Sequence, residues 1–334
     1  MKTSRKVTIW DGPNKRRTRA RKIRRVVEAR KSRFISKNPT ALTFAGQRAH
    51  FELGLKGRGA LRPQDIVTVQ SCQKVGAHDG GPILKKLISL RDKHLPGMLI
   101  WPHTFQSFSK NAYRDKFFIP PITSTTPGWF RSPVFKQEMY AFMRCAPRPF
   151  EVIDADLCGI FSERNAGDIV NLFYSGMAAD KGVLFINHVK GRDARKGKLL
   201  SFMRTYFKGC PHFDASALYD QDGNSLDLSR EDEDSLYWTR YVLAPIYYVC
   251  EAFNAGYRLT VERLVEYRDR DPSTRAGVNM LQWYFKFEEL PSVASLAEDN
   301  MVKFSADIAE DKKNLREQLE LLSQEKYAYT ALID

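Results

Sequence analysis

The chain has 334 residues, and 43% of them are apolar, which is enough to fill a sizeable hydrophobic core. Aromatic residues make up 12%, which argues against a largely disordered chain, and no apolar run approaches the roughly 18–20 residues that span a bilayer. The first residues lack the apolar core of a secretory signal, and the five cysteines are too dispersed for a zinc site. We therefore expect an intracellular protein, in the cytoplasm or in a host cytoplasm if it is viral, with no membrane partner and no metal.

The net charge of +14 is concentrated at the N-terminus. Residues 1–38 hold 15 Lys or Arg against two acids, so this segment alone carries +13. A like-charge block of this density repels itself, so we expect residues 1–37 to form a basic arm that is flexible unless bound. An apolar stripe of Ile23, Val26 and Val27 could dock this arm on a partner or on the body.

Nucleic acid, either DNA or RNA, is the predicted partner of the arm, because arginine outnumbers lysine there and suits phosphate geometry. The alternative is a solubilising or targeting tail. The predicted contacts are Lys15, Arg16, Arg17, Arg19, Arg21, Lys22, Arg24 and Arg25.

From residue 38 to about residue 290, strand-like runs alternate with helix-like runs. Strands are predicted at 39–45, 66–70, 98–101, 151–153 and 183–189, and helices at 47–56, 82–94, 134–143 and 167–179. Residues 102–134 form an insertion whose aromatic and basic residues suit either a stacking surface for single strands or buried packing.

The alternation of strands and helices then ends. An aromatic helix is predicted at 234–254, and two strands at 257–267 and 278–290 are joined to each other by a polar turn. The prediction is an α/β protein with a seven-stranded, mostly parallel sheet, helices on both faces and a C-terminal antiparallel hairpin. This domain spans residues 38–290. Residues 291–334 are predicted to be a helical segment that packs on the body or binds a protein partner.

Two aspartates end the fourth strand, in the stretch IDADLCG from Ile153 to Gly159. Asp154 and Asp156 occupy alternate positions, so they point the same way, and ligands of open α/β sheets bind at the carboxyl ends of strands. This pattern favours a chemical site. The alternative is that the carboxylates only cap backbone N–H groups of the next loop.

A basic loop follows the fifth strand at the same predicted edge of the sheet. It contains Lys190, Arg192, Arg195 and Lys196, which we expect to contact nucleic-acid phosphates. A solvated loop is the alternative.

The order of elements, together with a glycine after the first strand and the Asp-x-Asp-x-x-Gly stretch, resembles the class I S-adenosylmethionine-dependent methyltransferases. IDADLCG is similar to the D-x-D-P-[FY]-G motif of tRNA guanine N2-methyltransferases, with Leu157 and Cys158 replacing the proline and the aromatic. The resemblance implies S-adenosylmethionine as cofactor, held at Gly46, Gln70 and Asp154. It also implies Asp156, with Asp154, as the catalytic acceptor that orients an exocyclic base amine.

Departures from the family pattern leave three functions open. The lone Gly46, Gln70 in place of an acid, and the Leu157–Cys158 replacement favour an inactive fold that binds nucleic acid or recruits a partner. The retained aspartates favour an active nucleic-acid methyltransferase. A structural protein of a nucleoprotein assembly is the third possibility. Cys158 is disfavoured as a nucleophile, because nearby carboxylates raise the pKa of a thiol.

Overall fold

The computed structural model is an α/β protein built on one mixed sheet. It describes residues 12–45, 48–69, 81–101, 108, 137–138, 149–156, 161–190, 196–214, 218, 233–270, 277–297 and 301–332. All of the predicted helix at 134–143 except residues 137–138, which are helical, and all of the 102–134 insertion except Phe108 lie outside these ranges.

The sheet has eight strands in the order β3-β2-β1-β4-β5-β7-β6-β8. The strands are β1 (Ala41–Thr43), β2 (Ile66–Val69), β3 (Leu99–Trp101), β4 (Phe150–Asp156), β5 (Ala178–Lys190), β6 (Tyr257–Arg270), β7 (Gly277–Glu289) and β8 (Ala328–Leu332). The first five are parallel, and β7 lies antiparallel between β5 and β6. The α/β class and the C-terminal hairpin are therefore confirmed, and the order is compatible with a Rossmann-like fold.

The prediction of seven strands was wrong by one, because the C-terminal segment ends in a strand. β8 pairs in parallel with β6 and extends the edge of the sheet. Its stretch, AYTAL, is short and follows a long helix-like pattern, so its propensity alone was a weak signal. Backbone pairing with the exposed edge of β6 decides its conformation.

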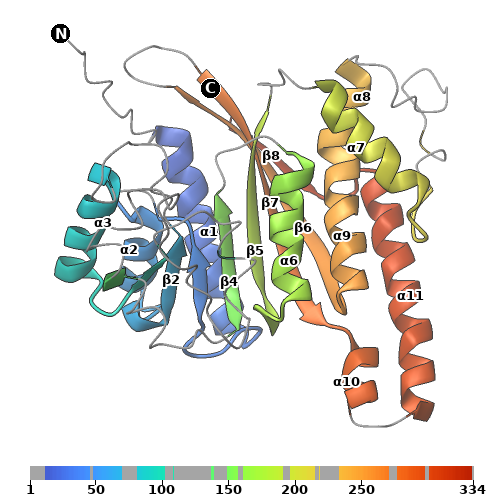
Figure 1. Cartoon of the computed structure of the whole chain (residues 1–334), viewed down its shortest axis with the longest axis horizontal. Helices are drawn as coiled ribbons and strands as arrows, with labels where there is room; N and C mark the ends of the chain where they lie inside the picture. Colours follow the sequence, from blue (N-terminus) through green and yellow to red (C-terminus); the bar gives the residue numbers. More distant parts are fainter. Residues whose placement is uncertain are drawn as a thin grey trace, which may run out of the picture.

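Helices cover both faces of the sheet (Figure 1). They are α1 (Pro13–Lys31), α2 (His50–Gly57), α3 (Gly81–His94), α6 (Glu163–Tyr174), α7 (Lys196–Lys208), α8 (Glu233–Trp238), α9 (Ala244–Asn254), α10 (Pro291–Ala297) and α11 (Met301–Ser323). One core lies between the sheet and α6, α7, α9 and α11, and a second lies between the sheet and α1, α2 and α3.

Local chemistry sets two helix boundaries that differ from the sequence prediction. α6 begins four residues before the predicted start, because the Ser162 hydroxyl accepts a hydrogen bond from Asn165 N at 3.3 Å and caps the helix. The predicted helix at 234–254 is instead α8 and α9, joined by a π-helical segment, Thr239–Leu243. Pro245 follows that segment and has no N–H to donate, so the regular hydrogen-bond ladder cannot continue through it.

The N-terminal basic segment is a helix packed on the body, in contrast to the flexible arm expected from its charge. Ile23, Val26 and Ala29 of α1 are buried in the second core. Gly54 of α2 permits this contact, since a Cβ there would lie 2.4 Å from Ile23 Cδ1. Asn14 fixes the start of the helix by donating from Nδ2 to two carbonyls at the ends of β6 and β8, each at 3.0 Å. The apolar stripe docks on the chain's own body.

The C-terminal helix α11 packs on the body through Leu315, Leu319 and Leu322, which are buried. A protein partner for this helix stays a prediction. Among the residues that the structure describes, no helix is both long enough and apolar enough to cross a membrane.

Candidate functional site

The candidate site lies at the carboxyl ends of β1 and β4, where the strand order reverses direction. β1 pairs with β2 on one side and with β4 on the other, and the chain fills the sheet outward in both directions from this point. In open α/β sheets such a switch point is where ligands bind. Gly46 in the loop after β1, residues 157–160 with Cys158 after β4, and Gln70 lie outside the described residues.

Asp154 and Asp156 point to the same face of the sheet, as their alternate positions predicted. That face carries α1, and a lysine of α1 meets each carboxylate. Lys22 Nζ lies 2.8 Å from Asp154 Oδ1 and 3.0 Å from Oδ2, and both residues are only 4% exposed. The Lys22 ammonium also lies 5.3 Å from the centre of the Phe51 ring. Asp154 is thus one half of a buried ion pair that joins α1 to β4.

Asp156 is the more accessible of the two aspartates. Its side chain is 16% exposed, and Asp156 Oδ2 lies 3.6 Å from the Nζ atom of Lys15, whose side chain is 20% exposed. Lys15 lies seven residues, or about two helical turns, closer to the start of α1 than Lys22. Asp156 therefore borders solvent at the end of β4, while Asp154 does not.

A further acid, Glu52 of α2, lies buried beside this pair. Burial raises the pKa of the Glu52 carboxyl, and the charge of Asp154 raises it further. Burial also raises the pKa of Asp154, against the opposing charge of Lys22. Sequence reasoning missed Glu52, because an acid in the first turn of a helix is ordinarily a solvated partner of the helix dipole. Only the packing of α1 over α2 encloses it.

Other polar side chains extend this layer between α1 and the sheet. The Tyr284 hydroxyl of β7 donates to the Thr18 carbonyl of α1 at 3.3 Å. Gln282 of β7 and Asn187 of β5 face each other across the ladder and are both buried. Asn187 Oδ1 and Gln282 Nε2 have no hydrogen-bond partner within the described part of the chain. Sequence reasoning missed these residues, because single polar residues within apolar strands carry no periodic signal.

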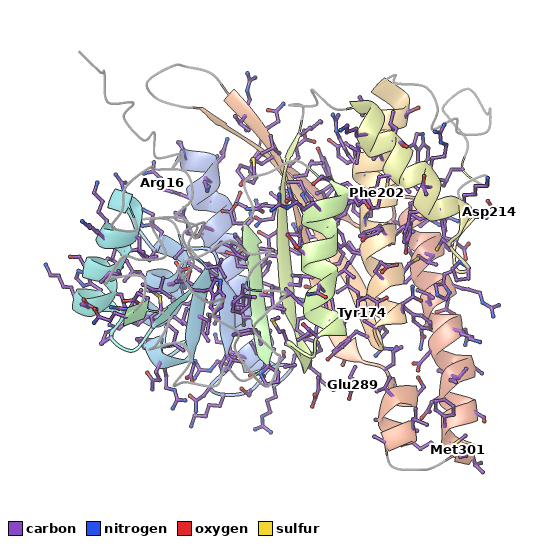
Figure 2. The ribbon with its side chains drawn as sticks, viewed as in Figure 1. Arg16, Tyr174, Phe202, Asp214, Glu289 and Met301 are labelled. Carbon is purple, nitrogen blue, oxygen red and sulfur yellow. The ribbon has the colours of Figure 1, made fainter. Side chains whose placement is uncertain are left out.

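The predicted nucleic-acid residues of α1 divide between two faces of the helix. Arg16, Arg17 and Arg24 are exposed, and Figure 2 labels Arg16 near the start of α1. Lys15, Arg19, Arg21 and Arg25 are half-buried, and Lys22 is buried. Arg25 Nε donates to Glu262 Oε2 of β6 at 2.5 Å. Lys15, Lys22 and Arg25 thus pair with acids of the body, and these pairs help a segment this basic to fold against it.

The basic loop after β5 is only partly described. Lys190 lies at the end of β5, and its Nζ donates to Glu266 Oε1 at 2.7 Å and to the Tyr241 hydroxyl at 2.5 Å. Glu266 also accepts from Tyr241 and Tyr329, so Lys190 belongs to an internal network that joins β5, β6 and β8. Arg192 and Arg195 lie outside the described residues. Lys196 begins α7, which sequence analysis did not predict, and its side chain is not described.

On the opposite face of the same edge, His188 is buried against aromatic rings. His188 Nε2 lies 3.0 Å from the Tyr248 hydroxyl, and the Phe161 ring meets the imidazole edge-on with centroids 5.2 Å apart. Burial lowers the pKa of His188 to about 3, so the ring is neutral at physiological pH.

The residues implied for S-adenosylmethionine were Gly46, Gln70 and Asp154, and only Asp154 is described. Asp154 does not fit the role of a cofactor ligand, because both of its oxygens lie within 3.0 Å of Lys22 Nζ. No group of three or more His, Cys, Asp or Glu residues in the described ranges could hold a metal ion.

Comparisons with known proteins add little to this geometry. No protein-family model matches the chain, and no curated protein matches it. Among solved structures, the chain is similar to one described as "Conversion of a Disulfide Bond into a Thioacetal Group during Echinomycin Biosynthesis". The identity is 12% and the TM-score 0.36, over 82% of this chain and 86% of that chain. At that TM-score the likeness supports no conclusion about activity.

Proposed function

We propose that this chain is a nucleic-acid-binding protein with a Rossmann-like body, and that the outward face of α1 binds the phosphate backbone. The observation that carries the proposal is the division of α1 into two basic faces. On the inward face, lysine and arginine side chains pair with the carboxylates of Asp154, Asp156 and Glu262 of the body. The outward face keeps its charges exposed.

Arg16 and Arg24 lie on that outward face, two helical turns apart, and have no partner among the described residues. Folding of the body does not account for them. Guanidinium groups match phosphate geometry, and each phosphate that they neutralise releases counterions, which favours binding at low salt.

The test is the double substitution Arg16→Glu and Arg24→Glu in the full chain, measured by fluorescence anisotropy with a labelled single strand and a labelled duplex. We expect the affinity to fall at least about tenfold at about 100 mM salt, and the slope of log affinity against log salt to shrink by about 2.

Lys312→Glu with Arg316→Glu is the matched control. These residues are exposed on α11, on the other face of the sheet from α1 (Figure 1), and the double substitution changes the net charge equally. The proposal fails if the unmodified chain binds neither probe, or if the α11 variant loses as much affinity as the α1 variant.

A second candidate function, methyl transfer to an exocyclic base amine, is favoured by Asp156. Its carboxylate borders solvent at the carboxyl end of β4, beside the switch point of the sheet. There it can accept a hydrogen bond from an amine and orient the nitrogen. S-adenosylmethionine would supply the methyl group.

Calorimetric titration of the full chain with S-adenosylmethionine separates the two candidates. Saturable heat with the unmodified chain, together with methyl transfer that is lost in Asp156→Asn, would favour the enzyme. If no heat is measured while nucleic-acid binding is intact, the methyltransferase candidate fails and the nucleic-acid-binding function stands.

A further inference from the structure

A groove lies at the amino-terminal edge of the sheet, at the opposite end of α1 from the two aspartates. Its volume is about 1140 Å³. The walls are the end of α1, the segment that leads into β1, the turn after α2, and the starts of β4 and β5. Sequence analysis placed the lining residues up to Lys37 in the basic arm, but it named none of the groove's cations as a nucleic-acid contact.

Cations without partners dominate this groove. Lys31, Arg33, Lys37 and Arg58 are exposed lining residues, and none of them has a partner in the described part of the chain. Lys181 adds a fifth charge, although its Nζ lies 3.4 Å from Glu288 Oε1. These side chains come from three segments far apart in the sequence, so the tertiary fold gathers them.

The acids of the groove do not cancel this charge. Glu151 keeps its negative charge, because Ser36 N and Ser36 Oγ, from which its two oxygens accept at 2.6 Å each, are neutral donors. It is one of two acids that face six cationic lining residues. Asp180 is the other acidic lining residue. The groove therefore keeps a clear excess of positive charge.

Neutralisation of the helix dipole explains only some of these cations. Arg30 and Lys31 lie in the last turn of α1, where basic residues stabilise the carbonyl end of a helix. Arg30 is also held, because its guanidinium donates to the Gly59 carbonyl. Arg33 and Lys37 lie beyond α1, and Arg58 is the C-cap residue of α2. No ion pair or side-chain hydrogen bond within the described chain accounts for these three side chains.

We infer that this groove is a second phosphate-binding site, which receives the sugar–phosphate backbone of the nucleic acid that α1 binds. The inference rests on the proposed function and deepens it. The outward face of α1 leads into the groove, because Arg16, Arg24 and Lys31 follow one another along that face and Lys31 also lines the groove. α1 has 19 residues and spans about 28 Å, which gives a continuous basic track of several nucleotides.

The test is the triple substitution Arg33→Glu, Lys37→Glu and Arg58→Glu in the full chain. Lys31 is left in place so that its positive charge continues to stabilise the carbonyl end of α1. With the same labelled single strand and duplex, we expect at least about a tenfold loss of affinity at about 100 mM salt, and a salt slope smaller by about 3. The matched control is Lys312→Glu, Lys313→Glu and Arg316→Glu on α11, which should leave affinity within about threefold.

Each outcome bears on either the groove or the proposed function. If the unmodified chain binds nucleic acid, the groove variant binds as tightly, and only the Arg16/Arg24 variant is weakened, the groove inference is wrong and the proposed function stands. If the unmodified chain binds neither probe, the proposed function itself fails. Poly-glutamate is the competing probe: a groove variant that loses poly-glutamate binding but keeps nucleic-acid binding would assign the groove to an acidic protein. Identical thermal unfolding of the variant and the control shows that the substitutions have not altered the fold.

Discussion

At the scale of single residues, Lys22 and Asp154 carry the main structural link between α1 and the sheet. Two charges removed from water lose several kcal/mol of hydration each, and their mutual attraction offsets this only while both are present. The contact of Lys22 with the Phe51 ring adds an attraction that depends on the positive charge. Removal of one partner therefore leaves the other charge buried and uncompensated.

We predict that Lys22→Met or Asp154→Asn alone lowers the free energy of unfolding by about 3–5 kcal/mol, measured by urea denaturation. The double variant Lys22→Met with Asp154→Leu should recover most of that loss, because both charges are gone. Lys15→Ala is the control, since its pair with Asp156 is partly exposed and worth about 0–1 kcal/mol. Single variants that cost no more than this control would contradict the assignment of Asp154 as a structural ion-pair partner.

Because His188 is buried in its neutral form, the free energy of unfolding depends on pH between about 3 and 6.5. The pKa of His188 falls from 6.5 in the unfolded chain to about 3 in the folded protein, so between these values only the unfolded chain takes up the proton. Its contribution is fully present above pH 6.5 and is lost as the pH falls toward 3, by at most about 1.4 kcal/mol per pH unit. Chemical denaturation across this window should show a steeper loss for the unmodified chain than for His188→Gln. Parallel curves for the two proteins would rule out this titration.

At the scale of elements, α1 is part of the core as well as a basic surface. Ile23, Val26 and Ala29 pack in the same cluster as Phe185 of β5 and Tyr284 of β7. A helix with this many like charges is stable here because the acids of the sheet neutralise its inner face. Without that helix, apolar surface on β5, β6 and β7 would be exposed to water.

A chain that begins at Asn38 should therefore lose stability together with nucleic-acid binding. We expect a loss of cooperative thermal unfolding and self-association, measured by near-ultraviolet circular dichroism and light scattering after size exclusion. The full-length Arg16→Glu/Arg24→Glu variant should lose binding with an unchanged melting temperature. If the shortened chain remained a cooperatively folded monomer, α1 would be an accessory element and not part of the core.

At the scale of the whole molecule, the carboxyl and amino ends of the parallel strands have different surroundings. At the carboxyl edge α1 covers Asp154 and leaves Asp156 at the border with solvent. At the amino edge the end of α1 opens into the basic groove. The helix α11, with the exposed Met301 at its start, lies on the other face of the sheet from α1 (Figures 1 and 2). We propose that nucleic acid lies along α1 between these two ends of the sheet. Charge reversals on the surface of α1 test this path. Deletion of the whole helix does not, because it also removes part of the core.

Sequence patterns alone predicted the α/β class, the alternation of strands with the helices α2, α3 and α6, and the C-terminal hairpin. These follow from hydrophobic periodicity and turn residues, which are local properties of the chain. The sequence also determined that Asp154 and Asp156 share one face at the end of a strand, because side chains alternate along a strand. It predicted the basic character of residues 1–37 but not their structure.

The contacts made by those charges became apparent only from the folded arrangement of the chain. The pairing of Lys22 with Asp154 joins residues 132 positions apart, and the groove collects Arg33, Arg58 and Lys181 from separate segments. The extended conformation of β8 likewise depends on tertiary structure, because β8 pairs with the free edge of β6. Like charges repel in an isolated segment, and no pattern within that segment reveals the carboxylates that the folded sheet brings against it. The physical reason is that burial and charge compensation are properties of surroundings, which the chain acquires only on folding.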